Sequence, residues 1–310
     1  MELNPKINAE SCMAIYEIIN NKLLKMGREV YSTANNEGEI ADNIKKKYTQ
    51  LESPKLSLQR IFEGFIFSAV NAQFKKNTIN FHIDESNRSQ AIRQILYKKS
   101  SLNINDHDFR KILLQLKELD PEDLFIKFQR ASYLDKKHNA RPLIIGKGTK
   151  TWEGWSKTII DVANLLIQFK DTDAFRQFII RSLPPPFPAL VLRRHIFGMS
   201  LTLVCDSLKD MGFHDYSKPD VHILDVFIQS GLIKNYKNSL DKELACFEAM
   251  REFVDLYNTT SQESEKLTQY ELDKKIWMIC SGKFYRDTDK ALPSQKESLI
   301  SEIQNFLGHN

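Results

Sequence analysis

Apolar residues recur along this chain at intervals of three and four positions, which is the period of an amphipathic helix. The clearest such face is formed by Trp155, Ile159, Val162, Ala163, Leu166 and Phe169. The same pattern predicts helices over residues 58–74, 109–119 and 240–257, and another that starts at a Thr268–Glu271 capping box and ends at Gly282. Glycine is scarce, and no Asn-Gly or Asp-Gly pair joins two alternating runs. The pattern therefore predicts an all-α protein.

The segment 188–212 predicts two helices joined by a tight turn. Pro188 stands where the first turn of a helix tolerates proline, and Gly198 in the turn 196–200 is free to take a positive φ. Ser200 can cap the second helix, and Gly212 can end it. The buried face of this helix is predicted to be Leu201, Val204, Cys205, Leu208 and Met211. The start of such a helix offers backbone N–H groups to a phosphate, although a plain αα-hairpin has the same pattern.

A single carboxylate follows this hairpin at a distance of about twenty residues. Asp220 stands in a Lys-Pro-Asp-Val-His turn that opens the next helix. Asp is common at helix N-caps, so Asp220 taken alone is explained as a cap. The helix dipole favours negative charge at this end, which predicts that Asp220 stays ionised. The order and spacing of the hairpin and the carboxylate are what indicate chemistry on a DNA backbone sugar.

Composition sets limits on the class of protein. The chain has 310 residues, 42% hydrophobic and 27% charged, which is typical of a soluble globular protein. We expect an intracellular protein, in the cytoplasm, nucleoid or nucleus, because no apolar run is long enough to span a membrane and the N-terminus lacks a signal-peptide core. The four cysteines are far apart and never form a Cys-x-x-Cys pair. We therefore expect buried or half-buried thiols in a reducing compartment, with no metal site and no cofactor.

The charge balance is mildly basic, with 44 Lys and Arg against 40 Asp and Glu. This balance permits binding of nucleic acid without indicating it. Most basic pairs are explained as solvated surface. Arg193 and Arg194 differ because they adjoin the hairpin. The Gly146–Lys150 segment lacks the spacing of a phosphate-binding P-loop, so it is interpreted as a basic loop.

The segment 196–222 resembles the helix-hairpin-helix DNA glycosylase superfamily. The family pattern is Leu-Pro-Gly-Val-Gly, a helix, and an aspartate in a Val-Asp-x-His or Pro-Asp-x turn. The corresponding residues are Ile196–Ser200 and, after the helix, Pro219–His222. The specific match covers about 35 residues. A looser likeness includes the segment 69–73, the helix 155–169 and the segment 276–280.

The resemblance implies two helical lobes with a cleft between them. The central lobe is expected over residues 58–205 and ends in the hairpin at about 188–212, whereas residues 1–57 and 206–310 form the second lobe. The implied partner is double-stranded DNA, from which an altered base is flipped out and removed. Asp220 takes the role of the carboxylate that stabilises the oxocarbenium-like sugar or positions the attacking water. No membrane partner is expected, and the sequence identifies no protein partner.

The resemblance also implies two groups of binding residues. The residues expected at the DNA backbone are Arg193, Arg194, Gly198, Met199, Ser200, Thr202 and His222. The candidates for the base pocket are Asn71, Gln73, Trp152, Trp155 and Tyr216, with Phe213 and His214 as further aromatic candidates. Core packing is the competing explanation for the aromatic residues, above all for Trp155 on its apolar face. For His222, contact with the phosphate backbone and contact with a neighbouring lobe remain open alternatives.

The sequence departs from the family in the residues that decide the type of reaction. Bifunctional members carry a lysine in the helix after the hairpin, and this chain has Thr202 near that position. A spare amine belongs to Lys218, two residues before Asp220. We therefore expect a monofunctional glycosylase without lyase activity. Two alternatives are an inactive DNA-binding module of the same fold and an all-α protein-interaction scaffold.

Overall fold

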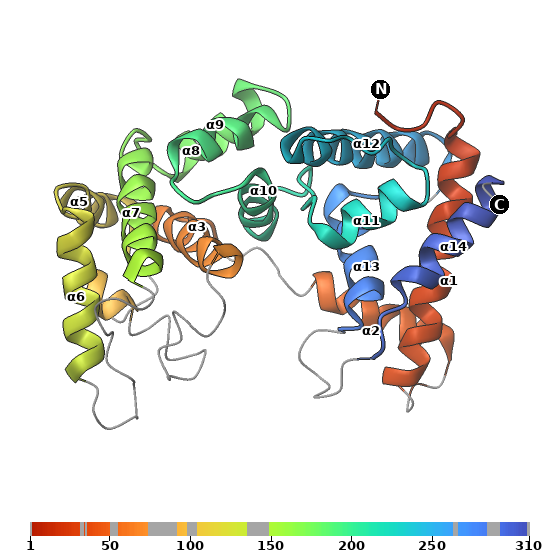
Figure 1. Ribbon diagram of the computed structural model, residues 1–310, viewed down its shortest axis with the longest axis horizontal. Coiled ribbons are helices and arrows are strands. Elements are labelled where there is room, and N and C mark those ends of the chain that lie inside the picture. The colour runs from red at the N-terminus through yellow and green to blue at the C-terminus, as the bar shows by residue number, and fades with distance from the viewer. Residues whose placement is uncertain are drawn as a thin grey trace. The chain divides into compact units, whose positions relative to one another are not determined.

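The computed structural model of this chain describes residues 2–31, 34, 36–49, 55–73, 92–97, 104–134, 149–262, 266–283 and 292–308. Every regular element in these ranges is a helix, which confirms the all-α prediction (Figure 1). The chain divides into two compact units. Unit 1 consists of residues 1–54 and 208–310, and unit 2 consists of residues 55–207.

Unit 2 is built around α7 (Thr149–Leu166), the helix predicted from its apolar face. This helix packs against α3 (Leu58–Gln73), α5 (Asp106–Lys117), α6 (Pro121–Leu134) and α9 (Phe187–His195). Between α7 and α9 lie the short α8 (Thr172–Gln177) and a π-helical turn, η2 (Phe178–Ser182). Trp155 of α7 is completely buried, and its indole N–H donates to the Ile66 carbonyl at 2.9 Å. The apolar residues that recur at helical spacing in α7 thus lie in the core of this unit.

Unit 1 is built around α13 (Gln269–Ser281), which packs against four other helices. These are α1 (Ala9–Val30), α11 (Val221–Gln229), α12 (Ser239–Thr260) and α14 (Lys296–Leu307). The remaining helix of this unit is α2 (Glu37–Thr49), which packs on α1. Although α13 lies in the core, it buries four polar or charged side chains as well as its apolar face. They are Gln269, Asp273, Lys274 and Lys275.

The residues that were predicted to cap or end helices do so in the structure. The side chain of Thr268 accepts the Glu271 N–H at 3.1 Å and caps α13, and Gly282 ends that helix with a φ of 68°. In α10 (Leu201–Asp210), which crosses from unit 2 into unit 1, Gly212 follows the last turn with a φ of 93°. These positions confirm the predicted ends of both helices.

All four cysteines are buried free thiols, as predicted from their spacing. Burial raises the pKa of Cys12 and of Cys280 to about 12. A thiol with such a pKa stays protonated and unreactive at neutral pH. Among the described helices, none combines the length and the apolar character that a membrane crossing needs.

Candidate functional site

The hairpin turn between α9 and α10 is held by side chains of α7. Gly198 has a φ of 76°, the left-handed conformation predicted for it. The Phe197 N–H donates to Asp161 Oδ2 at 2.9 Å, and the Thr158 hydroxyl donates to the Phe197 carbonyl at 2.8 Å. Ser200 caps α10 by accepting the Leu203 N–H at its Oγ. The turn is therefore attached to the central helix of unit 2 through both the N–H and the carbonyl of one residue, Phe197.

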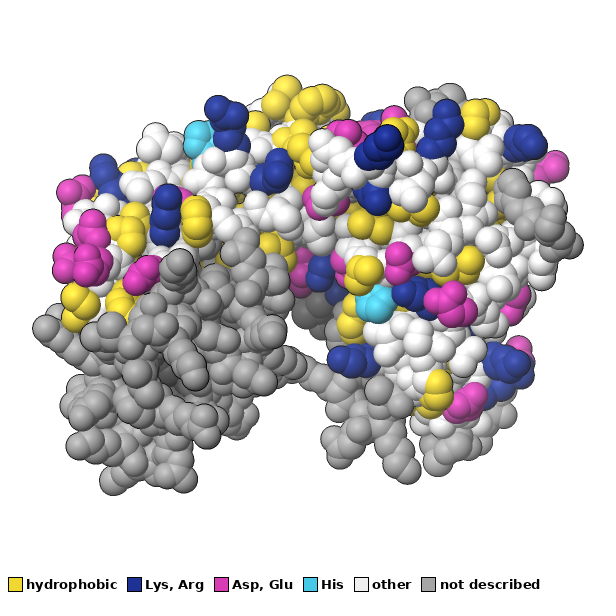
Figure 2. Space-filling model, in the orientation of Figure 1, with side chains coloured by type: hydrophobic (Ala, Val, Ile, Leu, Met, Phe, Trp, Pro, Cys, Tyr) yellow, Lys and Arg dark blue, Asp and Glu magenta, His cyan; other side chains and the backbone are white. Residues whose placement is uncertain are grey.

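Basic side chains lie next to this turn. Arg193, Arg194 and His195 at the end of α9 are exposed, and within the described ranges their side chains have no hydrogen-bond or ion-pair partner. Lys157 of α7 lies over the Phe197 ring, with Nζ 4.6 Å from the ring centroid. In Figure 2, Lys and Arg side chains lie over α9, and hydrophobic side chains gather where η2 leads into that helix. The exposed hydrophobic residues of that segment are Ile180, Leu183 and Phe187.

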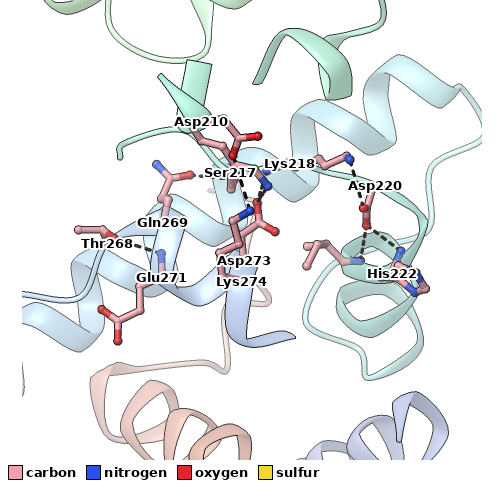
Figure 3. Close-up of polar contacts among 12 residues, drawn as sticks. Asp210, Ser217, Lys218, Asp220, His222, Thr268, Gln269, Glu271, Asp273 and Lys274 are labelled. Carbon is pink, nitrogen blue, oxygen red and sulfur yellow. Dashed lines mark hydrogen bonds and ion pairs between the residues drawn. The ribbon is translucent and has the colours of Figure 1, made fainter. Parts of the chain in front are cut away.

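Asp220 caps α11 with one carboxylate oxygen and leaves the other outside the cap (Figure 3). Its Oδ1 accepts the N–H groups of His222 at 2.9 Å and Ile223 at 3.3 Å. Its Oδ2 lies 3.9 Å from Lys218 Nζ. The side chain is 16% exposed. Asp220 is thus a true N-cap that keeps one oxygen for a further interaction.

The electrostatic surroundings of Asp220 act against the helix dipole. The dipole favours the ionised carboxylate, but the pKa of Asp220 is raised in the folded protein. Desolvation by burial is the largest cause, and the negative charge of Asp273 adds to it. The charges of Lys218 and His222 and the Ile223 N–H lower the pKa without cancelling these effects. Burial therefore outweighs the helix end at this site.

A buried ionic network lies behind the Asp220 loop, and the sequence did not predict it. Asp273 on α13 is 1% exposed and pairs with Lys209 Nζ at 2.7 Å. The same oxygen, Oδ2, accepts the Lys218 N–H at 2.8 Å. A signal existed in the sequence, because Asp273 is a charged residue on a helical face shared with Ile276 and Cys280. Nothing in the pattern, however, identified its partners.

The other residues that were predicted to contact the DNA backbone differ in exposure to solvent. Met199 is 5% exposed, so its side chain is part of the core and only its main chain can reach a phosphate. Thr202 and His222 are half-buried. His222 Nδ1 is buried and has no hydrogen-bond partner among the described residues. These facts leave both earlier interpretations of His222 open.

Two base-pocket candidates are wrong. Trp155 and Tyr216 are 0% and 1% exposed, and their rings pack on Phe128 and Phe247, so neither can stack on a base. The reason is the same for both: their apolar rings fill a core.

The other base-pocket candidates have separate outcomes. Phe213 is buried, whereas His214 is exposed and stacks on Tyr270. The side chains of Asn71, Gln73 and Trp152 and most of the segment 146–150 lie outside the described residues.

A cavity of about 290 Å³ opens in unit 1 among α1, α2 and α13. Its polar end is formed by Lys275, whose Nζ lies 2.9 Å from Glu271 and donates to Asn20 at 3.0 Å. Its apolar walls include Leu23, Leu24, Ile44 and Leu267. The sequence did not predict this cavity, because α13 is far from α1 and α2 in the chain.

The two halves of the predicted site belong to different units: the hairpin turn to unit 2 and Asp220 to unit 1. Within the described residues, no group of three or more His, Cys, Asp and Glu side chains is arranged to hold a metal ion. Comparisons with protein-family models, with curated proteins and with solved structures find no match to this chain.

Proposed function

We propose that the protein is a monofunctional DNA glycosylase, which hydrolyses the N-glycosidic bond of a flipped-out altered base and leaves an abasic site. The observation that carries this proposal is the geometry of Asp220. One oxygen fixes the carboxylate to the start of α11, and the other lies outside the cap beside Lys218. A carboxylate held in this way can face a developing positive charge without moving.

The chemistry that Asp220 supports is hydrolysis at the sugar. As the bond from C1′ to the base nitrogen breaks, the sugar acquires oxocarbenium character, which a carboxylate stabilises. Asp220 Oδ2 takes a proton from water while the water oxygen bonds to C1′. The base leaves with the electron pair of the broken bond. A raised pKa makes the carboxylate a better base for this step, since proton transfer is most efficient when the pKa lies nearer the working pH.

The hairpin supports the DNA-binding part of the proposal. The first N–H groups of a helix lack partners within that helix, and the turn before α10 is fixed by Asp161 and Thr158. Arg193 and Arg194 add two exposed positive charges that have no partner in the described ranges. Contacts of this kind bind phosphates without reading sequence.

The absence of lyase chemistry follows from the residues near the hairpin and the carboxylate. The position where a bifunctional enzyme of the similar family has its lysine is Thr202 here. Lys218 lies beside Asp220, where its ammonium group is paired with a carboxylate. An ammonium group has no lone pair with which to attack C1′. Removal of the base therefore leaves the DNA strand intact.

The test is an excision assay on duplexes that carry a panel of damaged and modified bases. Wild-type protein is expected to produce sites that break only after treatment with alkali. Asp220→Asn is expected to lose at least about 100-fold in single-turnover rate while still binding DNA, because the amide cannot stabilise positive charge or accept the proton. The matched control is Asp215→Asn, which removes an exposed carboxylate from the same loop and should leave the rate unchanged.

Three results would overturn the proposal in different ways. Strand nicking without alkali, together with borohydride trapping of a protein–DNA adduct, would replace the monofunctional enzyme with a lyase. DNA binding without excision of any base would make the chain an inactive binding module, in which Asp220 acts only as a cap. Absence of both binding and excision would leave the scaffold alternative.

A further inference from the structure

We infer that Asp273 is a positioning residue for Asp220. Asp273 fixes the place of Asp220 through the Lys218 amide, and it holds a second negative charge near the Asp220 carboxylate. This inference rests on the proposed function, because it concerns the carboxylate assigned to catalysis there. Asp273 belongs to α13 and is 53 residues away from Asp220 in the chain. Its role is therefore a product of the fold.

Lys218 connects the two carboxylates (Figure 3). Its backbone N–H donates to Asp273 Oδ2 at 2.8 Å, and its side-chain Nζ lies 3.9 Å from Asp220 Oδ2. Only Pro219 separates Lys218 from Asp220, and its ring restricts the backbone between them. Fixing the Lys218 amide thus fixes the direction from which the chain enters the cap of α11.

The first turn of α13 holds the rest of the loop as well. The Ser217 hydroxyl donates to Gln269 Oε1 at 3.0 Å, and Gln269 Nε2 donates to the Asp215 carbonyl at 2.8 Å. The Tyr270 N–H donates to the His214 carbonyl at 3.1 Å. The loop is therefore attached to α13 at four of the residues 214–218, and the contact with Asp273 is the one nearest to Asp220 in the sequence.

The ion pair between Asp273 and Lys209 calls for an explanation other than stability. Both side chains are buried, at 1% and 3% exposure. Removing two charges from water is costly, and a buried pair is often no more stable than two packed apolar side chains. Lys209 lies in the last turn of α10, so the pair joins the end of the helix that follows the hairpin to the loop that carries Asp220. Its physical role is to fix this spacing.

The charge of Asp273 also acts on Asp220 directly. It is the largest charge effect that raises the pKa of Asp220, and Lys218 is the largest effect in the opposite direction. The other titratable groups that interact with Asp220 are His222 on α11, Cys246 on α12 and Cys280 on α13. Because the two charges have opposite effects, removal of each should shift the pKa of Asp220 in an opposite direction, which a general loosening of the loop would not do.

The experiment measures the titration of Asp220 in the full-length free protein by NMR. The protein is labelled with 13C at aspartate carboxyl groups, and the Asp220 signal is assigned by its absence in Asp220→Asn. In the double variant Lys209→Met with Asp273→Asn, both buried charges are lost together, and the Asp220 midpoint is expected at a lower pH than in wild type. In Lys218→Met, which keeps the backbone N–H, the midpoint is expected at a higher pH.

The matched control is Asp210→Asn. Asp210 is a half-exposed carboxylate in the same turn of α10 and pairs with Lys274 of the same α13 at 3.6 Å. Its removal is expected to leave the Asp220 midpoint in place. A midpoint that is unchanged in the double variant, or that moves in the same direction in Lys218→Met, would overturn the inference. Lys218→Met keeps the inference testable if the double variant does not fold, because the Lys218 side chain is 23% exposed.

This titration needs no DNA, so its failure can be told apart from failure of the proposed function. If the wild-type protein excises a base, the acidic limb of its rate profile should move with the Asp220 midpoint in each variant. If the midpoints move as expected while no base is excised, the coupling between the carboxylates stands and the glycosylase proposal is wrong.

Discussion

The hairpin turn before α10 and the loop before α11 hold their charges in opposite ways. At the hairpin, Arg193 and Arg194 are exposed and have no partner among the described residues. In the loop, Asp220 is paired with Lys218, and Asp273 of α13, which holds this loop, lies almost completely out of contact with solvent. A surface that binds phosphates needs mobile charge near water, whereas a carboxylate that acts on one atom needs a fixed position and a tuned pKa.

The same contrast extends to the backbone. The hairpin turn depends on one left-handed glycine and on hydrogen bonds to a neighbouring helix. The loop before α11 depends on side chains of α13 that are distant in the sequence. Substitutions in the two regions should therefore differ in how much stability they cost and in which measurement detects them.

The largest effect is expected for Lys209→Met. The substitution leaves the Asp273 charge buried without its cation, which costs about 3–5 kcal/mol of unfolding free energy. Urea denaturation at neutral pH measures this loss. The double variant with Asp273→Asn should recover part of it, because no buried charge then remains unpaired. Equal losses in the single and double variants would show that the ion pair does not control the stability of this region.

A smaller effect is expected for Gly198→Ala at the hairpin. The φ of 76° is unfavourable for a residue with a Cβ atom and costs about 1–2 kcal/mol. We also expect weaker DNA binding, since the start of α10 would be displaced from its position. The control is Gly38→Ala in the first turn of α2, where no positive φ is required and alanine favours the helix. Equal effects at the two glycines in urea denaturation would contradict the role of the turn.

The next prediction compares two substitutions of Asp220. Asp220→Ala removes the N-cap of α11 and should cost about 0.5–2 kcal/mol, whereas Asn caps nearly as well as Asp. Asp220→Asn is expected to be at least as stable as wild type at neutral pH, because it removes a desolvated charge that Asp273 repels. Thermal or urea unfolding of both variants is the measurement. A large loss in Asp220→Asn would mean that the charge itself stabilises the fold.

The difference in stability between wild type and Asp220→Asn should change with pH in a definite direction. Because the pKa of Asp220 is raised on folding, the folded protein keeps its proton to a higher pH than the unfolded chain does. The stability contributed by Asp220 is thus fully present below the unfolded pKa and is lost as the pH rises through the folded pKa. The relative stability of Asp220→Asn should therefore increase with pH across that window. A constant difference between the two proteins from acid to neutral pH would be the contrary result.

The smallest effect on stability is expected for Arg193→Ala and Arg194→Ala, each within about 0.5 kcal/mol of wild type. Their effect on DNA affinity should be clear, because each substitution removes one phosphate contact and lowers the slope of log affinity against log salt by about 1. Arg176→Ala and Arg181→Ala in α8 and η2 are controls, since these arginines are exposed and lie outside the hairpin. Equal slopes for all four variants would place the DNA elsewhere.

Local patterns predicted the helices well. The period of α7, the cap at Thr268 and the glycine ends of α10 and α13 are set by residues within one or two turns of each other. The same local rules identified Asp220 as an N-cap. They were wrong for Trp155 and Tyr216 as base-pocket residues, because a large aromatic ring has the same sequence signal in a core and in a pocket.

What the sequence determined by itself, therefore, is the all-α class, the hairpin turn at Gly198 and the capping geometry of Asp220, since each depends on backbone preferences and on neighbours a few residues away. The tertiary structure alone decided which charges surround Asp220. Lys209, Lys218 and Asp273 meet only when α10, the loop and α13 are packed together. Burial raises the pKa of Asp220, and in the poorly screened interior the charge of a residue 53 positions away raises it further, against the effect of the helix end.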